Sequence, residues 1–94
     1  MSRLSNANAK ERKAIPIYSG FITYFPDAIV EVAKVSYNGN EQHHPGEPLH
    51  WDRSKSTDEL DSLMRHIIDG DWAAVAWRAM ANLQKECEDV RNTD

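Results

Sequence analysis

Two pairs of acidic residues stand at spacings that suit metal chemistry. Asp27 and Glu31 are four residues apart, and Asp58 and Asp61 are three apart. On a helix, either spacing places both carboxylates of a pair on one face. Four carboxylates in one place repel each other unless a cation joins them, and such oxygen ligands prefer Mg²⁺ or Mn²⁺. The plainer alternative is that Asp27 and Asp58 are first-turn residues favoured by the helix dipole.

Basic side chains close to these acids suit a phosphorylated ligand. Metal ions held by carboxylates keep open positions at which a triphosphate can share the ions. Lys34, Arg53, Lys55 and Arg65 are the candidates to neutralise its phosphates. The acids and bases together predict a site for a metal–triphosphate complex, against the simpler interpretation that both sets are solvated surface residues.

Four further side chains are candidates for ligand contacts, each with a structural alternative. Trp51 either stacks on a base or anchors the core. His50 and His66 either contact phosphate or base, or orient a carboxylate. Asn38 either reads the base or sugar, or only ends the helix before it. The loop histidines fit no common zinc spacing and lack an accompanying Cys; they are His43, His44 and His50.

The first acid pair belongs to a helix that we expect to begin at Pro26. Proline suits the first helical position, and apolar residues recur with the helical period to about Tyr37. The run Asn38-Gly39-Asn40 tolerates positive φ and is expected to end this helix. A long connection, residues 41–55, follows and is typical of a functional or disordered loop.

The second acid pair belongs to a helix that opens at Ser56 or Thr57. Ser56 and Glu59 match the spacing of a capping box. Gly70 ends this helix, and a last helix is expected from about Trp72 to Val90. Since strand signals are weak throughout, the sequence predicts an all-α fold, a small bundle of three to four helices.

Composition limits the size, environment and partners of the protein. A chain of 94 residues is one domain with a modest core, which we expect oligomerisation to complete. The net charge of −4 argues against general binding to nucleic acid or an anionic membrane. The single Cys87 forms no internal disulfide, and the sequence shows neither a signal peptide nor a membrane span, so a cytoplasmic protein is expected.

Beyond these patterns, much of the chain resembles a known family, the phage dATP/dGTP diphosphohydrolases, which are similar to the all-α MazG-type nucleoside triphosphate pyrophosphohydrolases. The resemblance covers about residues 12–88 and is most specific from Leu49 to His66. The residues that carry it are Arg12-Lys-Ala-Ile-Pro-Ile-Tyr-Ser-Gly20, Phe25-Pro-Asp-Ala28, Glu31-Val-Ala33, Val35-Ser36, Pro45-Gly46, Leu49-His-Trp51, Lys55-Ser-Thr-Asp58, Asp61 and Arg65-His66.

The resemblance implies a set of metal ligands. The MazG-type motif places acids on one helix and a further pair, separated by two residues, on the next. Glu31 matches the first half, with Asp27 as an earlier acid, and Asp58 and Asp61 match the second half. The first half is thinner than is usual in that family. Glu59 stands where histidine is more usual, so Glu59 is either a cap or an extra acid at the site.

The resemblance also implies an activity and a mechanism. Mg²⁺ or Mn²⁺ held by Glu31, Asp58 and Asp61 would bind the triphosphate and lower the pKa of a bound water, which attacks phosphorus. Lys34, Lys55 or Arg65 would stabilise the developing charge. The expected reaction converts purine deoxynucleoside triphosphates, dGTP and dATP, to monophosphates in phage nucleotide metabolism, with dGMP a possible supply for 2-aminoadenine DNA.

Three functional alternatives and a domain scheme follow from the sequence. The leading hypothesis is this hydrolase, as a dimer or tetramer in the host cytoplasm. The second is a non-catalytic helical module that binds a protein or nucleotide, and the third is an enzyme for another nucleotide such as dUTP. Residues 1–13 are expected to form a flexible arm, 14–90 a single MazG-like domain and 91–94 a frayed tail.

Overall fold

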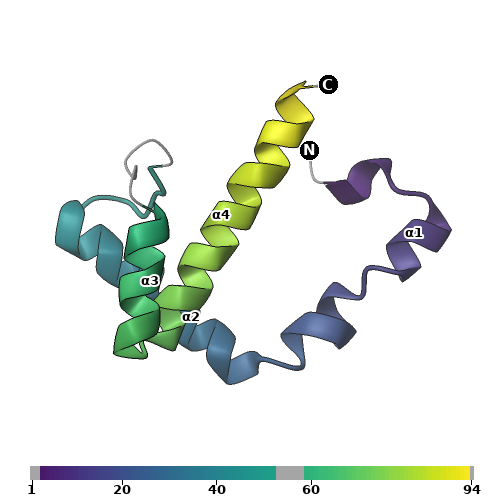
Figure 1. Cartoon of the computed structure of the whole chain (residues 1–94). Coiled ribbons are helices and arrows are strands. Elements are labelled where there is room, and N and C mark those ends of the chain that lie inside the picture. The colour runs from purple at the N-terminus through teal and green to yellow at the C-terminus, as the bar shows by residue number, and fades with distance from the viewer. Residues whose placement is uncertain (1–2, 53–58, 94) are drawn as a thin grey trace.

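The computed structural model describes residues 3–52 and 59–93, and over these ranges the chain is all-α, as the sequence predicts. A 3-10 turn η1, a short helix α1 and a π-helical turn η2 come first, and three longer helices follow (Figure 1). The elements are η1 (Arg3–Asn6), α1 (Ala9–Lys13), η2 (Tyr18–Ile22), α2 (Pro26–His43), α3 (Glu59–Asp69) and α4 (Trp72–Thr93).

The N-terminal segment reaches α2 through a tight helical turn. Asn8 caps α1, because its Oδ1 accepts a hydrogen bond from the backbone N–H of Glu11 at 2.8 Å. At η2, a Cβ on Gly20 would lie 2.7 Å from the Cγ of Pro16, so only glycine fits this close approach. Figure 1 shows the segment before α2 extending away from the three longer helices.

Helix α2 begins where the sequence predicts and ends later. Pro26 takes the first helical position. The prediction that Asn38-Gly39-Asn40 ends the helix was wrong, because α2 continues to His43. The side chain of Asn40 is buried and its Nδ2 donates to the backbone oxygen of Glu47 at 3.0 Å, so Asn40 fastens the following loop to an intact helix.

Helices α3 and α4 form an antiparallel pair joined by a glycine turn. Gly70 ends α3 with φ of 72°, as predicted, and Asp71 Oδ1 accepts from the N–H of Ala74 at the start of α4. Helix α4 extends to Thr93, beyond the expected end at Val90. The predicted cap at Ser56 or Thr57 lies outside the described residues.

Helix α4 is the centre of the packing, since it contacts both α2 and α3 (Figure 1). Ala74 and Ala81, seven positions apart on this helix, are the buried apolar residues among those described. No large side chain in the described ranges is fully buried. The core of a single chain is therefore small. None of the described helices is both long and apolar enough to cross a bilayer.

Candidate functional site

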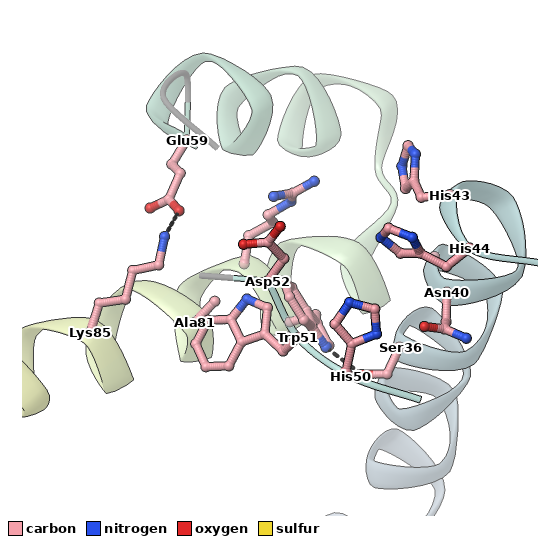
Figure 2. A pocket seen from close by; sticks show the side chains of 13 residues that line it. Ser36, Asn40, His43, His44, His50, Trp51, Asp52, Glu59, Ala81 and Lys85 are labelled. Carbon is pink, nitrogen blue, oxygen red and sulfur yellow. Dashed lines mark hydrogen bonds and ion pairs between the residues drawn. The ribbon is translucent and has the colours of Figure 1, made fainter. Parts of the chain in front are cut away.

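A polar cavity of about 420 Å³ opens between α2, the loop that follows it, the start of α3 and the middle of α4. Figure 2 shows Glu59 and Lys85 at one end, His43, His44 and His50 at the other, and Trp51 and Asp52 between them. The cavity thus combines side chains from α2, the loop after it, α3 and α4, which the helix packing brings together.

Two tryptophans line one wall of this cavity in a fixed arrangement. The rings of Trp51 and Trp77 meet edge to face, with centroids 5.8 Å apart and an interplanar angle of 75°. The indole Nε1 of Trp77 donates to Ser36 Oγ at 2.6 Å, which links the ring to α2. The guanidinium carbon of Arg78 lies 5.7 Å from the Trp77 ring centroid. The wall therefore offers an oriented aromatic surface beside a cation.

The histidine end of the cavity is formed by the last turn of α2 and the loop that returns from it. The rings of His44 and His50 are tilted at 48° with centroids 4.7 Å apart. His44 Nδ1 lies 3.2 Å from Glu47 Oε2, and His50 Nδ1 lies 3.3 Å from the backbone oxygen of Pro48. These contacts fix both rings where they line the cavity.

The other end is closed by an ion pair between α3 and α4. Lys85 Nζ donates to Glu59 Oε1, and both side chains are mostly buried, 24% and 21% exposed. Glu59 is the first described residue of α3. Glu59 lines the cavity, while Ser56, its partner in the expected capping box, lies outside the described residues.

Asn40 carries a buried polar atom without a partner at the histidine end. Its Oδ1 accepts no hydrogen bond from any described group, although the residue is only 7% exposed and its Nδ2 is satisfied by Glu47. A buried acceptor of this kind is costly unless water or another donor reaches it. Its presence beside the cavity distinguishes this end from an ordinary helix surface.

The described carboxylates among the predicted metal ligands lie elsewhere. Glu31 is exposed on α2, where its Oε1 lies 3.0 Å from Lys34 Nζ, and Asp27 and Asp61 are also exposed. None of them lines the polar cavity. Over residues 3–52 and 59–93, no three His, Cys, Asp or Glu side chains gather closely enough to hold a metal ion. Asp58 lies outside the described residues, as do Arg53 and Lys55.

The remaining predicted contacts divide between the cavity and other surfaces. His50 and Trp51 line the cavity, as a ligand-binding role requires. Asn38 and Arg65 are exposed and do not line it. His66 is half-buried and does not line the cavity; its Nδ1 lies 3.6 Å from Asp71 Oδ2 at the turn between α3 and α4.

Sequence reasoning missed the contribution of α4 to the cavity. No ligand contact was predicted from the sequence for Trp77, Arg78 or Lys85. A usable signal existed: Ala74, Arg78, Ala81 and Lys85 follow the helical spacing of four, three and four, so two buried alanines and two cations share one face. Because Arg78 and Lys85 share the face of α4 that packs through Ala74 and Ala81, their cations lie beside a helix contact, where a polar site can form.

No family model, curated protein or solved structure matches this chain. The geometry of the cavity therefore carries the functional argument by itself, and the resemblance to the diphosphohydrolases stays a prediction.

Proposed function

We propose that this chain binds purine deoxynucleoside triphosphates and hydrolyses them to monophosphates with a divalent metal ion. The observation that carries the proposal is the polar cavity, in which an oriented aromatic wall stands beside basic side chains. Stacking of a base on an aromatic ring contributes about 1–3 kcal/mol. A nucleotide is the ligand that uses both features at once, because it joins a flat base to an anionic phosphate chain.

In this proposal, one described side chain of the cavity binds the base and two others bind the phosphates. Trp51 is the stacking surface, since the indole of Trp77 is already bonded to Ser36. Lys85 and Arg78 are the described cations that can approach phosphates. In this proposal Lys85 exchanges its bond with Glu59 for a phosphate oxygen, which orders the ligand toward the start of α3.

The charge balance of the cavity supports a role for a metal ion. Its described charged residues are Asp52 and Glu59 against Arg78 and Lys85, so the formal charges cancel. A triphosphate entering a neutral cavity that already holds two carboxylates brings an excess of negative charge. A divalent cation accompanying the ligand removes that excess.

The chain offers ligands of suitable chemistry but does not gather them within one described copy. Carboxylates such as Glu31, Asp58 and Asp61 are the hard oxygen donors that Mg²⁺ and Mn²⁺ prefer. The described members, Glu31 and Asp61, do not join a group of three acidic or histidine side chains. When bound, the ion would supply charge neutralisation and an activated water.

One observation favours a second candidate function, a non-catalytic nucleotide-binding module. The same cavity would bind a nucleotide, while the absence of a three-residue cluster of possible metal ligands in the described ranges leaves nothing assembled for hydrolysis. The two candidates share the binding step and differ in turnover.

Product analysis separates the candidates. The chain is incubated with dGTP, dATP, dCTP, dTTP and dUTP, each with Mg²⁺, with Mn²⁺ and with EDTA, and the monophosphates are quantified. The hydrolase releases dGMP and dAMP only with metal. Binding without turnover identifies the module instead. Preferential hydrolysis of dUTP would show that the substrate class is a different one. If the chain neither binds nor hydrolyses any of these nucleotides, both candidates are ruled out.

Substitution of Asp61 tests the metal-ligand assignment. Removing a group that acts on the transition-state charge costs about 100-fold or more in rate, so Asp61→Ala is expected to lose turnover to that degree. Asp69→Ala, an exposed acid on the same helix outside every predicted site, is the matched control and should keep full activity. Circular dichroism checks that both variants stay helical. Full activity in Asp61→Ala would remove Asp61 from the site.

A further inference from the structure

A second cavity, of about 590 Å³, is open and almost wholly apolar. It lies where η2 and the first turns of α2 meet the middle of α4, and its lining includes Phe21, Phe25, Ile29, Val32, Ala76 and Met80. Phe21 and Phe25 contact each other edge to face, with ring centroids 5.7 Å apart, and remain 44% and 47% exposed. Met80 is 55% exposed on the facing helix. We call this surface the apolar cleft.

The chain exposes far more surface than a compact protein of its size. A folded monomer of 10.7 kDa has roughly 5,500 Å² of accessible surface, whereas this chain has 7594 Å². Its radius of gyration is 15.5 Å, against about 12 Å for a compact domain of this length. The excess, roughly 2,000 Å² by the same scaling, is surface that the chain does not bury on itself.

That excess has the magnitude of a permanent homodimer interface. Stable complexes of standard size bury about 800 Å² per partner, and obligate homodimers bury about 2,000–5,000 Å² in total. If each of two copies covers roughly 2,000 Å², the total falls within the obligate range. A partner that buried only about 800 Å² of this chain, as in a complex of standard size, would leave much of the excess surface exposed.

We propose that two copies of this chain pair through the apolar cleft. The proposal does not rest on the proposed nucleotide chemistry. In a two-fold arrangement each copy presents the same patch, so one contact covers both clefts. The α2–α4 pair of one copy against that of the other makes a four-helix layer, which a single chain with three longer helices lacks.

The chain also supplies apolar groups to close the edges of such a contact. Ile15, Ile17 and Tyr18 precede the cleft and are 46%, 46% and 66% exposed on a segment that extends from the body (Figure 1). Packing this segment across the partner buries these groups and the cleft together. The two cavities share only Ser36 and Trp77, so pairing through the cleft involves few of the residues that line the polar cavity.

The test measures the mass and the concentration dependence of unfolding of the full chain. Light scattering coupled to size exclusion should give twice the chain mass, and the melting temperature of a dimer rises with protein concentration. A wild-type chain that is monomeric at tens of micromolar, with a melting temperature independent of concentration, overturns the proposal. In that case its own N-terminal segment or another protein covers the cleft.

A variant pair locates the contact. Met80→Glu places a charge in the cleft of both copies and should weaken dimerisation by about 100-fold or more. Ile68→Glu, which alters an equally apolar and 79% exposed residue on α3 outside the cleft, should leave the mass unchanged. Should Met80→Glu lose its helical signal, Phe21→Ser on η2 replaces it. A dimer that survives both cleft variants, or that only Ile68→Glu dissociates, overturns the proposal.

Discussion

Trp77 is the residue on which both surfaces of this protein depend. Its ring forms a wall of the polar cavity and of the apolar cleft, and its indole N–H bonds Ser36 across the contact of α2 with α4. A tryptophan near the middle of a helix reads in the sequence as core or interface. Its second role in a polar cavity depends on Trp51 and Arg78, which only the folded chain brings beside it.

The bond between Ser36 and Trp77 should contribute measurably to stability. Ser36→Ala leaves the half-buried indole N–H without an acceptor and is expected to cost about 1–2 kcal/mol in the free energy of unfolding. Trp77→Phe removes the donor together with part of the ring. Because both variants lose the same bond, the double variant should cost less than the sum of the singles. Urea unfolding of the four proteins measures this, and strict additivity would mean that the bond contributes nothing.

At the scale of elements, local signals predicted the start of α2 and the end of α3 but not the ends of α2 and α4. Pro26 and Gly70 act through their own backbone conformation, so each predicted a boundary correctly. Asn38-Gly39-Asn40 tolerate a helix end without requiring one. The bond from Asn40 to Glu47 decides in favour of continuation, and that bond joins residues seven apart on a loop whose path the sequence does not reveal.

A pair of glycine substitutions tests the continuation of α2. Gly39 has helical backbone and no atom within 4 Å of an added Cβ, so Gly39→Ala should stabilise the fold by about 0.5–1 kcal/mol. Gly70 has φ of 72°, so Gly70→Ala should destabilise by about 1 kcal/mol or more. Thermal and urea unfolding give both values. A loss of stability in Gly39→Ala would place a helix end there, as the sequence alone suggests.

The candidate site was predictable only in part. His50 and Trp51 were chosen for their chemistry and do line the cavity. The acids were chosen for their spacing along helices, which fixes the face that each pair shares but not where that face points. In the described ranges Glu31 faces outward with Lys34, and Asp61 is exposed on α3. Convergence of two helices is a property of packing, and periodicity carries no information on it.

At the scale of the whole molecule, the shortage of buried apolar surface connects fold and function. Ala74 and Ala81 are the buried apolar residues of the described chain. The two tryptophans, Trp51 and Trp77, instead line the polar cavity. The expectation that oligomerisation completes the bundle stays a prediction, and the apolar cleft gives it a definite surface.

Binding of a nucleotide to the polar cavity is the central claim, and calorimetric titration tests it most directly. A non-hydrolysable dGTP analogue is titrated with Mg²⁺ into the wild-type chain, Trp51→Ala and the control Trp72→Ala, whose tryptophan is 67% exposed and lines neither cavity. Loss of base stacking should weaken binding to Trp51→Ala by about 5- to 150-fold, with Trp72→Ala unchanged. Equal affinity for Trp51→Ala and wild type, or no binding to the wild type, would contradict the claim.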